Sequence, residues 1–595
     1  MWSELHCHSA YSFMDGTALP AALAARAAAL GYRALALTDH DNLCGLVAHA
    51  RACRDVGIKP IAGAEVTLVD GSHLTLLARD AQGYRSLSSL LSHAHLSGKK
   101  GAPRLTVEEL ASYALGLECL TGCRRGPVAG ALLAGDAEQA GAVLDRLHAV
   151  FGAAHTWVEL QRGGLPDDNR LCYELARLAR RAGLPLVATG NAHYATVAER
   201  DLQDVLVCLR HRLPLNAARP HLRPGAPWCL LDPAEMARRF REYPAALRGA
   251  IALAERCGFD LAHIDTSFPA FPTPTGHTVP SYLRALVMDG AYARYGDPLP
   301  ETVRLRLEHE LSVIEALGLA DYILVVWDIV RHARTQGILC QGRGSSVGSV
   351  ACYCLSITSV EPLAHKLSFE RFLSIGRTDP PDIDIDLPAD RSGHSPAREA
   401  VIQYVLQRYA GHAALVANVV TYQKRLAVRE VGMALGLSPD QRDALSRDAD
   451  LIVGEQDADL IVGEQAGGTS DAHRVEVVPA LTERTLSLSP SGVLRRLRRL
   501  SGRLVGLPRH LSQHPGGIVL TARPLAEVVP VERARMADRL VIQWDKDSAE
   551  LAGVRGVNGQ SRPARLGHAR RHRRLLRVHC PADRHAAWPA RHNMR

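Results

Sequence analysis

Three aspartates alternate with two isoleucines in residues 381–388, which read Pro-Asp-Ile-Asp-Ile-Asp-Leu-Pro. On a β-strand successive side chains point to opposite faces, so Asp382, Asp384 and Asp386 would share one face while the isoleucines enter a core. Like charges this close repel one another unless a cation lies between them, and hard oxygen ligands suit Mg²⁺. The stretch therefore predicts a magnesium-binding strand, with a solvated acidic loop as the alternative.

A glycine- and serine-rich segment, residues 341–349, lies about forty residues upstream and reads Gln-Gly-Arg-Gly-Ser-Ser-Val-Gly-Ser. Glycines let the backbone approach a ligand closely, and the N–H groups, the serine hydroxyls and Arg343 are donors for a polyphosphate. No Gly-Lys-Ser/Thr follows, so this is not a Walker A loop. A lone loop of this kind is more often a plain turn, but with the carboxylate strand it predicts phosphoryl or nucleotidyl transfer.

Residues 1–95 place metal-ligand residue types directly after strand-like patterns. His6 and His8 lie two apart, so on a strand they would face the same way and could share one metal ion. His40 follows one apolar pattern, and Glu65 ends the next. A β/α barrel presents such residues at the C-terminal ends of its strands, so the pattern predicts a barrel with a metal site. Structural histidines are the alternative.

Length and composition narrow the class of protein. A chain of 595 residues indicates several domains, because single cores stop growing well below that size. The sequence has no basic segment followed by an apolar signal and no run of about 18 apolar residues, which predicts a cytoplasmic protein without a membrane span. Thirteen cysteines without regular spacing and without a Cys-x-x-Cys pair indicate reduced thiols.

The formal charge of +8 is concentrated at one end of the chain. Residues 555–595 hold eleven arginines, no lysine and one acid, a net charge of +10, so the other residues carry a net charge of −2. Overall basicity therefore does not indicate that the body of the protein binds nucleic acid. That hypothesis depends on the motifs.

Four motifs follow one another in the middle of the chain: Asp-Tyr-Ile-Leu-Val-Val-Trp-Asp at 321–328, Gly-Arg-Gly-Ser-Ser at 342–346, Phe-Glu-Arg-Phe-Leu at 369–373 and Pro-Asp-Ile-Asp-Ile-Asp at 381–386. On these motifs the chain resembles the palm of a bacterial C-family DNA polymerase of the polymerase III alpha-subunit type. The resemblance implies an α+β palm of the Pol beta-like nucleotidyltransferase kind. It implies that Asp382 and Asp384 are catalytic Mg²⁺ ligands. The implied contacts to the nucleotide phosphates are Gly342, Arg343, Gly344, Ser345 and Ser346.

Later segments extend the resemblance. Residues 416–425 match the palm again, and their last two, Lys424 and Arg425, are expected to contact nucleotide or DNA phosphates; a merely solvated pair is the alternative. The resemblance implies a palm at 271–432, a helical thumb at 433–510 and a return of the palm at 511–554. In the thumb, arginines interleaved with leucines at 494–503 predict a basic helix face for phosphates, or equally a solvated one.

The beginning of the chain resembles the polymerase-and-histidinol-phosphatase (PHP) domain that opens C-family polymerases, here residues 1–270 with a helical extension. The resemblance implies a metal cluster that would take Zn²⁺ or Mn²⁺. Its positions carry over onto His6, His8, Asp15, His40, Glu65, His73, Cys123, Asn191 and His193. Active members have aspartate where this chain has Asn191, a neutral ligand, so metal occupancy and any phosphoesterase or proofreading activity are in question. The compact domain resembles the error-prone, damage-associated branch.

The match to the palm stops after about residue 554. The family's strand with a third catalytic aspartate would follow, but residues 555–595 have an arginine- and histidine-rich composition without a hydrophobic period. We interpret this tail as frameshifted and disordered, with the fingers missing; a basic arm for DNA is the alternative.

The predicted function is template-directed DNA synthesis on primer-template DNA with dNTPs, in error-prone translesion or repair synthesis, impaired in this copy. The resemblance implies partners among the sliding clamp and other replication or mutagenesis proteins. Two other functions remain open at this point: a PHP metal-dependent phosphoesterase or 3′–5′ exonuclease, and a non-catalytic DNA-binding fragment.

Overall fold

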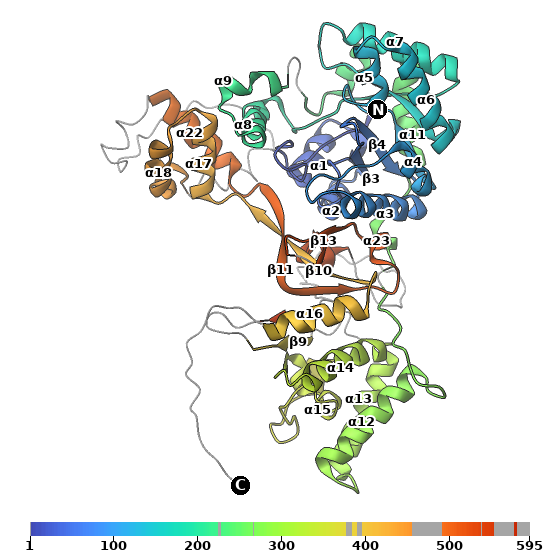
Figure 1. Ribbon diagram of the computed structural model, residues 1–595, viewed down its shortest axis with the longest axis vertical. Helices are drawn as coiled ribbons and strands as arrows, with labels where there is room; N and C mark the ends of the chain where they lie inside the picture. Colours follow the sequence, from blue (N-terminus) through green and yellow to red (C-terminus); the bar gives the residue numbers. More distant parts are fainter. Residues whose placement is uncertain are drawn as a thin grey trace. The chain divides into compact units, whose positions relative to one another are not determined.

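The structure is a computed structural model, and it describes residues 2–223, 228–265, 267–375, 383–388, 396–454, 491–536, 538–552 and 576–579. The chain forms two compact units (Figure 1). The first comprises residues 1–264, 418–512 and 529–532, and the second comprises residues 265–417, 513–528 and 533–595. Both units combine helices and strands, which confirms the predicted α/β multidomain fold.

The first unit contains a seven-stranded sheet in which the strands lie in chain order. They are β1 (Trp2–Glu4), β2 (Tyr32–Leu37), β3 (Lys59–Thr67), β4 (His73–Ala78), β5 (Leu117–Leu120), β6 (Thr156–Gln161) and β7 (Leu186–Thr189). All neighbours pair in parallel except β4, which is antiparallel to both β3 and β5. Because β4 runs the opposite way, its first residue, His73, lies opposite Thr67 at the end of β3.

The two outer strands of this sheet are joined just beyond their ends. An isolated parallel bridge connects Cys7, after β1, with Ala192, after β7. The His8 N–H donates to the Ala192 carbonyl oxygen at 2.7 Å, and the Ala192 N–H donates to the His6 carbonyl oxygen at 3.0 Å. The sheet therefore closes into a barrel, as predicted, and the closure brings segments from its two ends together.

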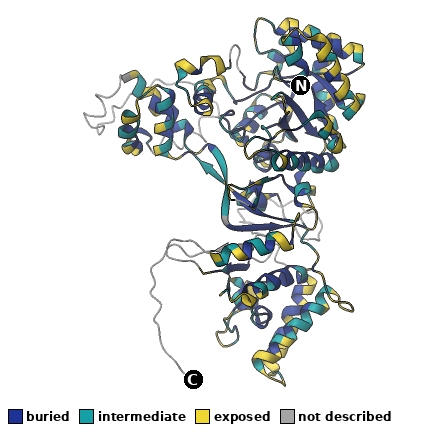
Figure 2. Ribbon diagram, viewed as in Figure 1, coloured by how far each residue is buried: buried dark blue, intermediate teal, exposed yellow. Residues whose placement is uncertain are grey.

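Helices surround this barrel (Figure 1). The strands are buried, whereas the helices bury one face and expose the other (Figure 2); for example, α11 packs against β7 and α7 against β6. These helices are α1 (Pro20–Ala29), α2 (Leu46–Asp55), α3 (Ala81–Ser97), α4 (Val107–Leu110), α5 (Pro127–Leu133), α6 (Ala137–Phe151), α7 (Asp168–Ala182), α10 (Pro233–Arg239) and α11 (Pro244–Arg256). Between α7 and α10 the chain also forms α8 (Arg200–His211) and α9 (Leu215–Ala218), which belong to a separate helical core.

A separate helical core in the first unit joins distant parts of the chain. Leu206 of α8 belongs to one apolar cluster with Val428 of α17 and Leu497 of α22. The later helices of this group are α17 (Lys424–Ala434), α18 (Pro439–Arg447), α19 (Ala449–Ile452) and α22 (Ser491–Leu504). The group contains the described part of the predicted thumb, and it also contains α17, which lies within the range predicted for the palm.

The second unit contains a sheet with the strand order β13, β10, β11, β14, β9, β8. Its strands are β8 (Gln341–Gly344), β9 (Ile383–Asp386), β10 (Ala413–Thr421), β11 (Pro508–Leu520), β13 (Leu540–Asp545) and β14 (Leu576–His579); the short β12 (Val531–Arg533) precedes β13. β8 is antiparallel to β9, and β14 lies between β9 and β11. Of the tail after about residue 554, the structure describes only the backbone of β14; the rest lies outside the described residues, and the interpretation of the tail as frameshifted and disordered stays a prediction.

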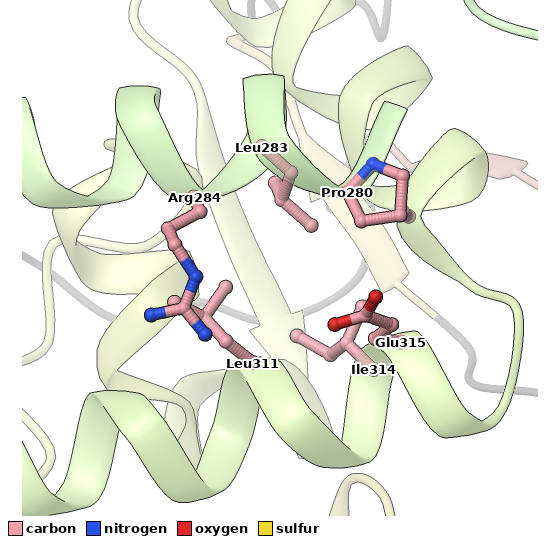
Figure 3. Close-up of a pocket in the computed structure, with 7 residues that line it drawn as sticks. Pro280, Leu283, Arg284, Leu311, Ile314 and Glu315 are labelled. Atoms are coloured by element: carbon pink, nitrogen blue, oxygen red, sulfur yellow. The ribbon is translucent and has the colours of Figure 1, made fainter. Parts of the chain in front are cut away.

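The helices of the second unit are α12 (Val279–Tyr295), α13 (Glu301–Ala316), α14 (Ala320–Thr335), α15 (Val350–Cys354), α16 (Pro396–Arg408), α23 (Leu525–Val528) and α24 (Lys546–Leu551). Between α12 and α13 lies a small pocket whose labelled side chains are mostly apolar, with Arg284 and Glu315 as its charged members (Figure 3). The pocket shares no residue with β8 or β9. Among the described helices none has both the length and the apolar character needed to cross a membrane.

A buried histidine makes the stability of the first unit depend on pH. Nε2 of His49, on α2, donates to the Leu35 carbonyl oxygen at 2.9 Å. Burial lowers the pKa of His49 to about 4, whereas an unfolded histidine has a pKa near 6.5. The unfolded chain therefore binds this proton more readily, and the free energy of unfolding should fall by on the order of 3 kcal/mol as the pH drops from 7 to 4.

We expect His49→Gln to remove this part of the pH dependence, measured as urea unfolding at pH 7 and at pH 4. The exposed His263, in the same unit, provides the control, since His263→Gln should keep the wild-type pH dependence. An equal pH dependence in both variants would contradict the assignment to His49.

Candidate functional site

The carboxylate strand adopts the predicted alternation. Ile383 and Ile385 on β9 are fully buried, and Asp384 is 9 % exposed. One carboxylate oxygen of Asp384, Oδ1, is buried without a hydrogen-bond partner among the described residues. A buried, unsatisfied carboxylate oxygen is costly unless a cation binds it, so Asp384 fits the predicted Mg²⁺ ligand. Asp382 lies outside the described residues.

Pairing of β8 with β9 places Arg343 directly opposite Asp384. Its Nη2 is 3.4 Å from Asp384 Oδ2, and its Nε donates to Asp386 Oδ1 at 2.9 Å. The guanidinium thus neutralises two of the alternating carboxylates. Arg343 was predicted to contact nucleotide phosphates, and in the structure its partners are these aspartates.

The glycine-rich segment is part strand and part turn. Gly342 and Gly344 belong to β8, and residues 345–348 form a 3₁₀ turn. A side chain on Gly342 would lie 2.7 Å from the Ile357 carbonyl oxygen, and Gly344 has a φ of 79°, a region that favours glycine. Ser346 is buried, and its hydroxyl donates to the Arg343 carbonyl oxygen at 3.1 Å. Ser345 begins the turn. Glycine therefore serves backbone geometry at both positions.

A buried carboxylate anchors the end of this segment. Glu310 of α13 accepts hydrogen bonds from the Ser349 hydroxyl at 2.7 Å and from the N–H groups of Val350 and Ala351 at 3.0 Å each. It also pairs with Arg306 at 2.9 Å. An anion at the first turn of a helix satisfies N–H groups that lack intrahelical partners. Glu310 therefore fixes the start of α15 and, through it, the glycine-rich segment.

The barrel closes around a second cluster, at the edge where its parallel strands end. His6 and His8 follow β1, His40 follows β2, Glu65 lies near the end of β3, and His73 begins the reversed β4. Asp15, Cys123, Asn191 and His193 lie in loops at the same strand ends, and eight of these nine side chains are buried while His40 is partly exposed. The structure thus describes every residue of the predicted PHP set.

Glu65 is the centre of this cluster. Its carboxylate lies 3.2 Å from His6 Nε2, 2.6 Å from His40 Nδ1, 3.1 Å from His73 Nδ1 and 3.9 Å from His8 Nε2. Burial opposes its ionisation, but the charges of His40 and His73 hold the pKa of Glu65 well below its usual range. Two ligand sets that could hold a metal ion share this carboxylate: His6 with His8, and His40 with His73.

Asp15 forms a second centre, and two of its neighbours are arginines. Arg210 Nη1 is 3.0 Å from Oδ2, and Arg223 Nη2 is 3.2 Å from both carboxylate oxygens. His40 Nε2 lies 3.1 Å from Oδ2. Burial disfavours the charge of Asp15, but Arg223 and His193 hold the pKa of this carboxyl well below its usual range. Burial and Arg223 lower the pKa of His193 to about 3, so this imidazole is neutral.

Asn191 and Cys123 are positioned differently from the ligands around Glu65. Asn191 Oδ1 is 2.9 Å from His193 Nε2, and its amide donates to Gln161 at 3.3 Å. Cys123 accepts from the Arg125 N–H at 3.4 Å, and burial raises the pKa of its thiol. Cys123 belongs to neither ligand set around Glu65.

The sequence reasoning missed two groups of residues at this cluster. Glu159 on β6 lies 2.7 Å from His6 Nδ1, and Gln161, two residues later, donates to Glu159 at 2.7 Å. Their polar alternation in an apolar strand was a signal that could have revealed them. Arg210 and Arg223 offered no such signal, because they come from α8 and the loop after α9.

The two basic residues predicted to contact phosphates begin helix α17 in the first unit. Lys424 Nζ lies 3.4 Å from Asp450 Oδ1, and Arg425 is exposed. An exposed ion pair of this kind contributes little to stability. Both side chains stay near solvent, as a phosphate-binding role would require.

Comparison with known proteins matches both halves of the chain. Residues 4–163 match the PHP domain, and residues 281–555 match the bacterial DNA polymerase III alpha NTPase domain. An error-prone DNA polymerase of Mycolicibacterium paratuberculosis is 42 % identical over 568 residues, covering 93 % of this chain and 49 % of the relative. One of Pseudomonas fluorescens is 40 % identical over 564 residues, covering 94 % and 50 %. The chain thus spans about half the length of the curated relatives it matches.

Among solved structures, an amidohydrolase from Chromobacterium violaceum is 18 % identical and covers 40 % of this chain, with a TM-score of 0.23. That score is too low to support a shared fold.

We expect Glu310→Gln to lower the free energy of unfolding of the second unit by about 3 kcal/mol, because it leaves buried N–H groups and Arg306 poorly paired. Chemical denaturation measures the loss. The matched control is Glu308→Gln on the same helix, where an exposed carboxylate pairs with Arg284 at 2.8 Å and should contribute less than about 1 kcal/mol. Equal losses in both variants would contradict the anchoring role of Glu310.

Proposed function

Because the chain belongs to the bacterial DNA polymerase III alpha family, with a PHP domain ahead of its polymerase domain, we propose that it serves template-directed DNA synthesis. The primer 3′-hydroxyl would attack the α-phosphate of a dNTP, and pyrophosphate would leave. The observation that carries this proposal is the β8–β9 pair, which sets Asp384 beside Arg343.

The carboxylates of β9 would hold the metal ions. Asp382 and Asp384 are the proposed ligands, and the unpartnered Oδ1 of Asp384 supports this role. Bound Mg²⁺ would activate the 3′-hydroxyl and neutralise charge on the leaving group. In the absence of Mg²⁺, Arg343 compensates the negative charges of Asp384 and Asp386.

Arg343 and the glycine-rich segment would bind the triphosphate. Once Mg²⁺ compensates Asp384, the guanidinium is free to bind a phosphate, for which its planar donors are suited. Gly342 and Gly344 set the backbone geometry of the segment, and Ser345 would supply a hydroxyl. The Ser346 hydroxyl would contact the triphosphate only after leaving its hydrogen bond to the Arg343 carbonyl oxygen. Glu310 fixes the segment in place.

The cellular setting follows from the relatives, which are named error-prone DNA polymerases. We propose a cytoplasmic role in synthesis across or near DNA damage, with primer-template DNA and dNTPs as substrates. Lys424 and Arg425, with the arginines of α22, are the proposed phosphate contacts in the first unit. The sliding clamp and other replication or mutagenesis proteins are the proposed partners.

We propose that this chain alone extends primers slowly. The strand beside β9 is β14, whose Arg577 is in register with Asp384 and whose His579 is in register with Asp386. Its sequence, Leu-Arg-Val-His, contains no carboxylate. This strand therefore cannot add an acidic metal ligand next to Asp384.

Metal-dependent phosphoester hydrolysis at the PHP cluster is the second candidate function. The convergence of His6, His8 and Glu65 favours it. Asn191 weighs against it, since a neutral amide there cannot help to bridge cations.

Single-turnover primer extension with Mg²⁺ tests the polymerase proposal. We expect Asp384→Asn to lower the extension rate by about 100-fold or more, because the metal loses a charged ligand. Asp386→Asn, on the same strand, is the matched control and should cost less than about tenfold. Similar losses in the two variants would argue against the assigned metal ligand. Rapid extension by the unchanged chain would overturn the proposed impairment.

A further inference from the structure

The cluster at the end of the barrel has two halves that differ in how their polar atoms are used. In the half around Glu65, His6 Nε2, His8 Nε2, His73 Nδ1 and Glu65 Oε1 are buried and, among the described residues, lack a hydrogen bond of acceptable geometry. These atoms nevertheless converge, since the ligand atoms of His6, His8 and Glu65 lie within 4.8 Å of one another. Such convergence without hydrogen bonding is typical of a metal site.

Hydrogen bonds on the far side of each imidazole fix which nitrogen is free. His6 Nδ1 lies 2.7 Å from Glu159 Oε1, a carboxylate that can only accept, so Nδ1 carries the proton. His8 Nδ1 lies 3.1 Å from the Ser12 hydroxyl, whose own proton goes to Asp39 at 2.6 Å. His8 Nδ1 must therefore donate as well. In the neutral imidazoles that a metal would bind, both Nε2 atoms then carry the lone pair, as in metal-ligating histidines with a carboxylate or hydroxyl behind them.

In the half around Asp15, by contrast, the carboxylate already has several side-chain partners. Its carboxylate contacts Arg210 at 3.0 Å, Arg223 at 3.2 Å, Gln203 at 3.2 Å and His40 at 3.1 Å. Arg223 Nη2 also lies 3.2 Å from His193 Nδ1. Arginine is always charged in proteins, so a second cation at this place would meet two fixed positive charges.

His40 does not extend the open half. Its Nε2 lies 3.1 Å from Asp15 and its Nδ1 lies 2.6 Å from Glu65, so its ring bridges the two carboxylates. The 3.2 Å contact of His6 Nε2 with Glu65 Oε1 differs, because neither atom makes a hydrogen bond of acceptable geometry among the described residues. Of the two ligand sets around Glu65, the set of His6 and His8 is therefore the one that keeps free atoms on every member.

We propose that this cluster binds one transition-metal ion, through His6, His8 and Glu65, and that Arg210 and Arg223 take the place of a further ion at Asp15 and His193. Two nitrogens and one carboxylate suit Zn²⁺ and leave a fourth coordination position. The neutral side chain of Asn191 fits this charge balance, because the arginines already compensate Asp15. The family's nine-residue set is thus only partly used for metal in this chain.

The stoichiometry of bound zinc tests the proposal on the full chain. The protein is stripped with a chelator, loaded with Zn²⁺, passed through gel filtration and analysed by elemental mass spectrometry. To correct for adventitious zinc on other histidines, the zinc content of the His8→Ala/Glu65→Gln variant is subtracted from that of the wild type. We expect a difference of one zinc ion per chain. A difference of zero, or of two or more, would overturn the proposal, whatever the other variants do.

The arginine half is tested by removing its cations. We expect Arg210→Ala/Arg223→Ala/Asn191→Asp to bind one more zinc ion than the wild type, whereas Asn191→Asp alone should not. Arg219→Ala, at an exposed arginine of the same region, is the matched control and should leave the zinc content unchanged. If the triple variant loses its cooperative thermal melt, Arg210→Gln/Arg223→Gln/Asn191→Asp replaces it, with the same expected gain. Failure of the folded variant to gain zinc would overturn the role of the arginines.

Glu159 is a positioning residue in this proposal. Glu159→Gln should weaken zinc affinity by about 10–100-fold, because a neutral amide is a weaker acceptor for the Nδ1 proton of His6. The number of ions bound at saturation should not change. Competition with a fluorescent chelator measures the affinity. An unchanged affinity would contradict the hydrogen-bond assignment. None of these readouts depends on DNA synthesis, so they stand apart from the polymerase proposal.

Discussion

A buried carboxylate needs a positive partner, and this constraint governs both candidate sites. Taking an ionised group out of water costs several kcal/mol unless a cation compensates it. Asp384 is held against Arg343, Glu65 is surrounded by imidazoles, and Asp15 contacts two guanidinium groups. The protein thus compensates its clustered carboxylates with its own arginines and histidines. The sites differ in whether a bound ligand could replace those side chains.

The backbone puts these charges in place by strand pairing. Register between β8 and β9 sets Arg343 opposite Asp384, so the charge compensation follows from main-chain hydrogen bonds. In the barrel, the bridge between Cys7 and Ala192 brings the histidines after β1 to the loop that carries His193. Side chains far apart in sequence therefore meet because strands end at a common edge.

Local patterns in the sequence predicted the main strands and the residues that gather at their ends. Alternation around Asp384 and residue types after strands depend on short-range periodicity, which a single sequence contains. The partners of Asp15 could not be predicted in this way, because Arg210 and Arg223 reach it from elements about 200 residues away in the chain. The place of β14 was not predicted either, because its position between β9 and β11 depends on strands far away in the chain.

The reversed strand β4 affects the order in which the barrel cluster can assemble. Glu65 and His73 lie on one antiparallel hairpin, with Thr67 paired to His73 across a five-residue connection. Hairpins form in microseconds, and contacts close in sequence lose little loop entropy. Asp15 meets Arg210 only after the chain has returned through β7 and α8. During folding, the half around Glu65 can therefore bring Glu65 and His73 together early, whereas the half around Asp15 must wait for closure of the whole barrel.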